Sequence, residues 1–169
     1  FVDNFSVFFK LFFLLLGCLI ILCSIDYVKK HIDHSGEYYG ILTISILGMM
    51  LMAASGELLT AYISLELLSF CLYVMVSLGK DSPKSSEASI KYILLGAFSS
   101  AIILFGISQI YGILGTTRFS EINDILLASS DSLNPVLLLG ISFVIAGIGF
   151  KIAAVPFHMW APDVYEGEP

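Results

Sequence analysis

The chain has 169 residues, of which 57% are hydrophobic and 13% are charged, with a formal net charge of -6. Soluble domains carry about 25% charged residues, so this composition excludes an ordinary soluble domain and indicates an integral membrane protein in a lipid bilayer. No basic patch with interleaved aromatic residues is present in the sequence, and we therefore expect no nucleic-acid partner.

Five nearly uncharged runs are long enough to be membrane spans, because about 20 residues of α-helix cross a bilayer. We expect the spans at about residues 5–25, 38–54, 58–78, 88–114 and 136–156. The runs lack the two-residue alternation of barrel strands, and a helix satisfies its own backbone groups in lipid. The sequence therefore predicts an all-α bundle of about five transmembrane helices, forming a single transmembrane unit over residues 1–169.

The first expected span and the loop after it contain thiols and imidazoles that could be metal ligands. Cys18 and Cys23 lie in this span and Cys71 lies in the third, all without C-x-x-C spacing. We expect these thiols to be reduced and packed in apolar helices. His31 and His34 lie in the loop with no further ligand beside them, which favours a solvated loop. We therefore expect no metal site.

Glu66 is the only charged residue in the apolar run of residues 58–79. A charge at mid-bilayer costs at least about 2.5–3.5 kcal/mol, so such residues are rare and usually mark an ion or proton path. On a helix, Glu66 shares one face with Tyr62, Ser69 and Tyr73, whose hydroxyls can hydrogen-bond a carboxylate. Glu66 is therefore a candidate proton carrier, and the alternative is a structural ion pair between helices.

The longest connection, residues 115–134, has apolar residues at helical spacing. These residues are Phe119, Ile122, Ile125 and Leu126, and acidic residues oppose them. A short amphipathic helix lying at the membrane interface fits this pattern. An ordinary connecting loop fits it equally well.

Basic residues are divided unequally between the two sides of the membrane. One side holds only Lys10 and Arg118, whereas the other holds a group of five lysines. By the positive-inside rule, the lysine-rich side faces the cytoplasm, or the equivalent matrix or stroma. The lysines of that group are Lys29, Lys30, Lys80, Lys84 and Lys91.

Lys151 is the only charged residue in the run of residues 132–162. It shares a helix face with Gly140, Val144 and Gly147, and such a seam of small residues lets another helix approach closely. A desolvated lysine can lose its proton, unlike arginine, so Lys151 is a second candidate proton carrier. The alternative is a lysine that extends its side chain to the membrane surface.

A break in the fifth span is predicted near Pro156. Proline lacks a backbone N–H and clashes with the carbonyl four residues earlier, that of Ile152, so the helix should break one turn after Lys151. Broken helices beside buried charges recur in transporters. His158 follows the break and is a candidate proton relay, because its ordinary pKa lies near neutrality; the alternative is a structural histidine.

The segment of residues 149–167, GFKIAAVPFHMWAPDVYEG, closely resembles a motif of a known family. That motif, F-K-x-x-x-x-P-F-H-x-W-x-P-D-V-Y-E-G, belongs to the antiporter-like subunit N of NADH:quinone oxidoreductase, in the respiratory complex I family. Residues 65–69, LELLS, look like the glutamate-bearing helix of that subunit. The resemblance covers essentially the whole chain, with Ala161 standing where many members have threonine.

The resemblance implies a fold of two inverted repeats, each with a broken helix, of which this chain is an internal piece. It implies a proton-translocating membrane subunit of an oxidoreductase enzyme, with Glu66 and Lys151 as the coupled pair of a proton half-channel. It places no cofactor on this chain, and quinone, FMN and iron–sulfur clusters on partner subunits of the membrane complex. The implied location is the bacterial plasma membrane, or an organelle inner or thylakoid membrane.

Three functional readings follow. In the first, quinone reduction elsewhere in the assembly shifts the pairing of Glu66 with Lys151 and so moves a proton. In the second, the chain belongs to a cation/proton antiporter of the same fold, which would purify without redox partners. In the third, the charges only hold helices together, and a neutral pair in their place would leave activity intact.

Overall fold

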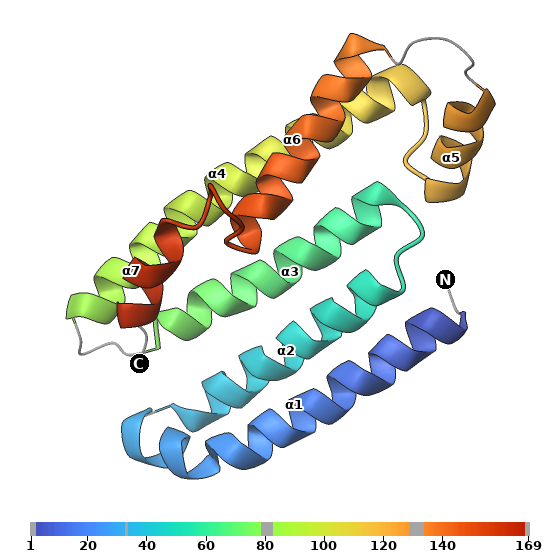
Figure 1. The fold of residues 1–169 in the computed structure, drawn as a ribbon. Helices are drawn as coiled ribbons and strands as arrows, with labels where there is room; N and C mark the ends of the chain where they lie inside the picture. The colour runs from blue at the N-terminus through green and yellow to red at the C-terminus, as the bar shows by residue number, and fades with distance from the viewer. Residues whose placement is uncertain (1–2, 33, 79–82, 129–133, 168–169) are drawn as a thin grey trace.

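A computed structural model describes residues 3–32, 34–78, 83–128 and 134–167, and over these residues the chain forms seven helices joined by short connections (Figure 1). In chain order the helices are α1 (Asn4–His31), α2 (Ser35–Ala53), α3 (Leu58–Val76), α4 (Pro83–Leu114), α5 (Phe119–Ala128), α6 (Pro135–Lys151) and α7 (Trp160–Gly167). The expected all-α architecture is confirmed.

The helices α1 to α4 are each long and apolar enough to cross a membrane. Only 11% of the apolar window of α1 is buried against protein, compared with 39% for α4, so α4 is the most enclosed of these four spans. The helix α6 has 17 residues, which extend for about 25 Å at 1.5 Å per residue. Because the hydrocarbon layer is about 30 Å thick, α6 alone crosses only part of it.

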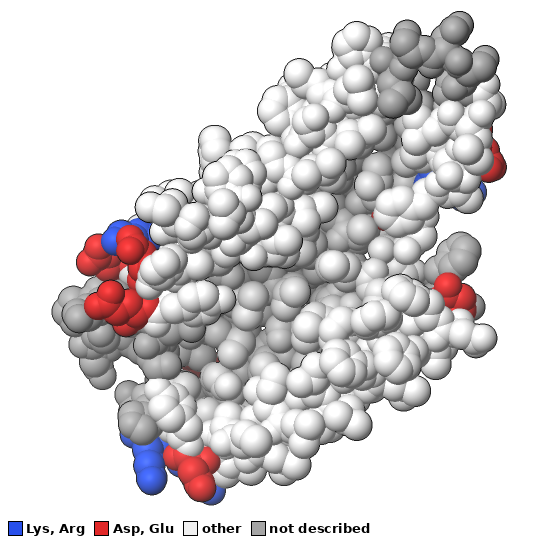
Figure 2. All heavy atoms as spheres, viewed as in Figure 1, with Lys and Arg blue, Asp and Glu red and all other residues white. Residues whose placement is uncertain are grey.

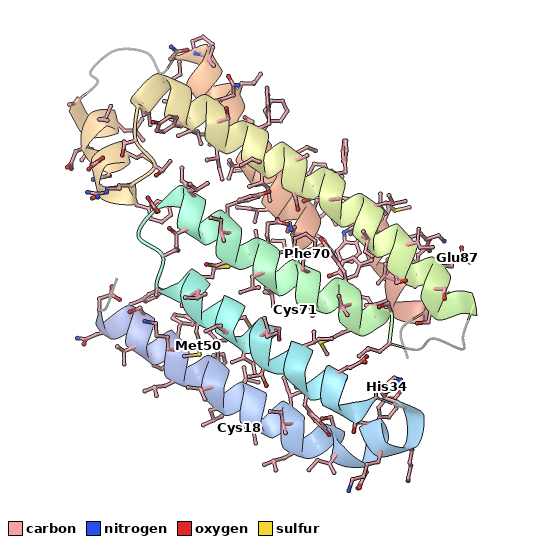
Figure 3. All side chains as sticks on the ribbon, turned by 180° about the vertical axis from the view of Figure 1, so that it is seen from behind. Cys18, His34, Met50, Phe70, Cys71 and Glu87 are labelled. Carbon is pink, nitrogen blue, oxygen red and sulfur yellow. The ribbon has the colours of Figure 1, made fainter. Side chains whose placement is uncertain are left out.

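The helices pack in chain order, with α1, α2 and α3 side by side and α6 and α7 against α4 (Figure 1). Charged side chains gather at the ends of the helices, and the long flank between these ends is uncharged (Figure 2). Seen from behind, His34 before α2 and Glu87 near the start of α4 lie toward the same end of the bundle (Figure 3). An uncharged belt between two charged ends is the surface that a membrane-spanning protein needs.

Two helices are longer than their expected spans. The helix α1 continues to His31, beyond the expected end near residue 25, and α4 begins at Pro83, before the expected start near residue 88. Hydropathy marks the part of a helix that lies in lipid, whereas backbone hydrogen bonding continues the helix into the interface. Proline is also favoured in the first turn of a helix, where no N–H is needed.

The fifth expected span, residues 136–156, ends earlier in the structure, because α6 stops at Lys151. The N–H groups of Ala153 and Ala154 donate back to carbonyls of the last helical turn at 3.0 and 2.8 Å, and Ala153 is left-handed with a φ of 51°. This pattern is a Schellman motif, which ends a helix by satisfying its free carbonyls. The break predicted near Pro156 is confirmed, but it starts directly after the lysine and not one turn later.

The glycine seam expected on α6 packs against α4. A Cβ atom on Gly106 of α4 would lie 2.6 Å from the carbonyl oxygen of Gly140, and one on Gly147 would lie 3.1 Å from the carbonyl oxygen of Ser99. Ser99 also donates its hydroxyl proton to the carbonyl oxygen of Gly147 at 2.8 Å. The close approach of these two helices therefore depends on glycine, as in small-xxx-small packing.

The connection after α4 contains the helix α5, which confirms the amphipathic-helix reading of this segment. Its start is joined to the α2–α3 turn by an isolated antiparallel bridge between Glu57 and Arg118. The N–H of Leu58 donates to Thr117 at 2.9 Å, and the N–H of Phe119 donates to Gly56 at 3.2 Å. We call this bridge the Glu57 clasp; it ties two connections at the end of the bundle opposite the lysine group.

Candidate functional site

Glu66 on α3 and Lys151, the last residue of α6, form an ion pair inside the bundle. The Lys151 Nζ atom lies 2.8 Å from Glu66 Oε1, and only 8% of the lysine side chain and 15% of the glutamate side chain are exposed. Attraction between charges is much stronger in such an enclosed site than in water. The structure thus brings together the two charges that the sequence singles out.

Two serine hydroxyls complete the coordination of the pair. Lys151 Nζ donates to Ser69 Oγ at 2.9 Å, and Ser69 donates its own proton to the carbonyl oxygen of Leu65 at 2.8 Å. Ser100 on α4 lies 2.7 and 2.9 Å from the two carboxylate oxygens of Glu66. Each charged group therefore has a hydroxyl partner in addition to the opposite charge, which offsets part of its desolvation.

Lys151 is held in place by aromatic packing at the end of α6. Trp160 of α7 stacks on Tyr92 with ring centroids 5.0 Å apart and on Phe150 at 5.8 Å. Its indole Nε1–H donates to the carbonyl oxygen of Phe150 at 2.9 Å, which also accepts the N–H of Ala153 at 3.0 Å. This cluster, which continues into the buried residues Val76 and Val164, fixes the backbone that carries the lysine.

The ion pair spans helices that are otherwise little in contact. The helix α4 packs against both α3 and α6, whereas the backbones of α3 and α6 do not pack closely against each other along their described lengths. The link between these helices is made by the long side chains of Glu66 and Lys151. The contact between α3 and α6 at this point is therefore made by side chains and not by closely packed backbones.

The other sequence candidates lie apart from the pair. His158 is exposed in the segment between α6 and α7, and among the described residues the hydrogen-bond partners of the pair are serines. His34 is exposed and precedes α2. Within the described ranges, no group of three or more His, Cys, Asp or Glu side chains could hold a metal ion.

Ser100 is the member of the site that sequence reasoning missed. Its signal is weak, because serine is common in membrane helices and its hydroxyl can bond to the preceding helical turn. The adjacent pair Ser99 and Ser100 in the middle of an otherwise apolar stretch could have drawn notice. Only the packing of α4 against α3 shows that one of them faces Glu66.

The fold and the site define a helical membrane protein with a broken helix beside a buried lysine–glutamate pair, an arrangement that recurs in transporters. Comparison with known proteins narrows the class. The family model described as NADH:quinone oxidoreductase/Mrp antiporter, TM, matches residues 55–169. The chain belongs to this family.

Individual relatives give the same picture. The chain is 48% identical over 168 residues to NADH-quinone oxidoreductase subunit N of Moorella thermoacetica, a match that covers 99% of this chain and 35% of the relative. In the solved respiratory complex I from Thermus thermophilus with bound aureothin, one chain is similar with a TM-score of 0.75 and 33% identity, over 99% of this chain and 35% of that one. The chain thus spans about a third of the length of these relatives.

A more distant structural likeness is found in the Mrp complex from Dietzia sp. The match has a TM-score of 0.68 and 22% identity, and it covers 78% of this chain and 24% of that one. At this identity the likeness shows a shared fold.

Proposed function

We propose that this chain is part of a proton-translocating membrane subunit of an NADH:quinone oxidoreductase, and that the Glu66–Lys151 pair carries the proton step. The single observation that supports this role is the buried contact of 2.8 Å between the two charges. Charged groups inside a membrane are costly and mark ion or proton paths. The similarity to subunit N of known oxidoreductases supports the assignment to that enzyme complex.

In the proposed mechanism the pair alternates between a closed and an open state. When it is closed, the carboxylate and the ammonium attract each other across 2.8 Å. Opening removes this attraction, so that a proton can leave Lys151 toward the rest of the channel and another can be taken up by Glu66. When the pair closes, the proton on Glu66 passes to the amine of Lys151, so that both groups are charged again and one proton has moved from Glu66 to Lys151.

The geometry fits such a cycle. The lysine stem has several rotatable bonds, and the backbones of α3 and α6 are not closely packed against each other in the described part of the chain. The end of α6 remains fixed by Trp160 during side-chain movement. NADH oxidation and quinone reduction, with FMN and iron–sulfur clusters, are assigned in this proposal to partner subunits.

The test uses the full-length subunit in its assembled complex, reconstituted into vesicles. Glu66→Gln and Lys151→Met should each lower proton pumping driven by NADH oxidation by at least about tenfold, because each removes a proton-transfer group. The double variant, with both Glu66→Gln and Lys151→Met, is the most informative of the three. It leaves no unpaired charge in the buried site, so it should assemble better than either single variant. Glu87→Gln and Lys29→Met, at exposed positions, are the matched controls and should pump normally.

Two results would contradict the proposal. Full pumping by the double variant would show that the pair only holds helices together. Exchange of cations for protons in vesicles without NADH, in a preparation that lacks redox subunits, would instead assign the chain to an antiporter of the same fold.

A further inference from the structure

The hydroxyl of Ser100 faces two acceptors at once. Its Oγ atom lies 2.7 Å from Glu66 Oε1 and 2.9 Å from the backbone carbonyl oxygen of Gly96. The residue is only 7% exposed. Because a hydroxyl has a single proton, Ser100 can donate to the carboxylate or to the carbonyl, but not fully to both.

We propose that Ser100 is a positioning residue that keeps Glu66 hydrogen-bonded in both of its protonation states. The inference rests on the proposed function and deepens it, since it names a third member of the proton site. Ser100 acts through Glu66 and is not itself charged at any stage.

The two states differ in the direction of the hydrogen bonds. With Glu66 ionised and paired to Lys151, Ser100 donates its proton to the carboxylate. When Glu66 takes up a proton, the new carboxyl O–H donates to Ser100 Oγ, and the serine proton turns to the carbonyl oxygen of Gly96. No bond to the serine proton breaks, so the only proton gained is the one on Glu66.

The other serine at the site, Ser69, is engaged with Lys151. The proton of Ser69 is given to the carbonyl oxygen of Leu65 at 2.8 Å, and its oxygen accepts from Lys151 at 2.9 Å. Ser69 therefore serves the lysine, and Ser100 serves the glutamate. When the pair opens, each group keeps one hydroxyl partner, which avoids leaving a polar group unsatisfied in a buried site.

The experiment compares three substitutions in the assembled, full-length complex. Ser100→Ala removes the hydroxyl, Ser100→Thr keeps it, and Ser89→Ala is the control for loss of a buried serine on the same helix, because Ser89 bonds only within α4. One readout is the rate of proton pumping per NADH oxidised. The second is the infrared band of the protonated Glu66 carboxyl, assigned by its loss in Glu66→Gln.

We expect Ser100→Ala to lower pumping by about tenfold, the effect of losing one hydrogen bond to a charged group, and to shift the carboxyl band to higher wavenumber. Ser100→Thr should restore both, and Ser89→Ala should change neither. If Ser100→Ala does not assemble, Ser100→Cys supplies a side chain of similar size with a weak donor and should show the same band shift.

The inference is overturned if the carboxyl band is unchanged without the hydroxyl, or if Ser100→Thr and Ser89→Ala lose as much pumping as Ser100→Ala. These outcomes are separate from a failure of the proposed function. If Glu66→Gln pumps normally, the proposed function fails. If Glu66→Gln loses pumping while Ser100→Ala pumps normally, only the role of Ser100 is rejected.

Discussion

At the residue scale, the arrangement around Glu66 and Lys151 stabilises both charges without locking them together. The contact of 2.8 Å and the two serines offset the loss of hydration. Removing one member of a buried pair costs about 3–5 kcal/mol, whereas replacing both is often nearly neutral. The opening of this pair belongs to the proposed mechanism, and the serines are the partners that each group has besides the opposite charge.

Gly96 gives a test of the packing beside the pair. A Cβ atom at this position would overlap the hydroxyl of Tyr73, which is only 4% exposed. We expect Gly96→Ala to destabilise the protein by about 1–3 kcal/mol, the usual cost of overpacking a buried site. Thermal unfolding of the purified protein in detergent measures the change.

The matched control lies on the same helix. Gly112 is exposed and has no atom near its Cβ position among the described residues, so Gly112→Ala should be neutral or stabilise the helix by up to about 1 kcal/mol. If the two substitutions destabilised the protein equally, overlap with Tyr73 would not be the cause of the effect of Gly96→Ala.

At the element scale, the end of α6 determines where the lysine is placed. A helix of 17 residues that stops in a Schellman motif places Lys151 at its last position, buried beside Glu66. Trp160 then donates a second hydrogen bond to the carbonyl oxygen of Phe150 in the capped turn. The short helix, its cap and the stacked indole thus act together to place one amine.

The Glu57 clasp is expected to respond to acid. The hydrogen bond from Thr60, and a second from Thr117, hold the pKa of the Glu57 carboxyl below its ordinary value of 4.5. A group with a lowered pKa in the folded state contributes stability above its unfolded pKa, and this contribution is lost as the pH falls through the folded pKa. The clasp should therefore open below pH 4.5 and be intact at neutral pH.

Hydrogen exchange of the Leu58 and Phe119 amides, which form the backbone part of the clasp, measures this opening relative to amides within α3. In Glu57→Gln, which cannot titrate, the step in protection should disappear. Retention of the step in this variant would assign it to another group.

At the scale of the whole molecule, the charged side chains lie at the two ends of the helix bundle (Figure 2). A cavity of 340 Å³ is lined by residues from the ends of α1 and α3, the first part of α2 and α4, and α7, including Tyr27, Tyr38, Tyr92 and Trp160. These segments lie at one end of the bundle, together with Lys29 and Lys91. Lys80 lies outside the described residues, and the side chain of Lys84 is likewise not described.

The orientation predicted by the positive-inside rule can be tested with single cysteines. In a protein whose natural cysteines have been replaced, Lys29→Cys should react with an impermeant maleimide only from the cytoplasmic side, and Arg118→Cys only from the other side. Sealed right-side-out and inside-out vesicles allow the two membrane sides to be labelled separately. Labelling of both positions from one side would contradict the predicted topology.

Much of this arrangement could be predicted from periodicity and charge. The helices α1 to α6 each correspond to an expected apolar run or amphipathic spacing, because lipid allows few other backbone structures. The helix α7 (Trp160–Gly167) was not predicted. The helix ends were less predictable, as in α6, whose cap depends on a left-handed alanine where glycine is usual. Ser100 was not predictable, because nothing in the local sequence shows which neighbouring helix a serine faces.

The sequence by itself determined that Glu66 and Lys151 are the unusual residues, since a lone charge in an apolar run is costly wherever the helix lies. The tertiary structure decided that the two are partners, that Ser100 joins them, and that the helix stops at the lysine. The physical reason is that the free-energy cost of a lone charge in an apolar run can be judged from the neighbouring residues. The pairing of the two charges depends instead on the distance between residues more than 80 positions apart in the chain.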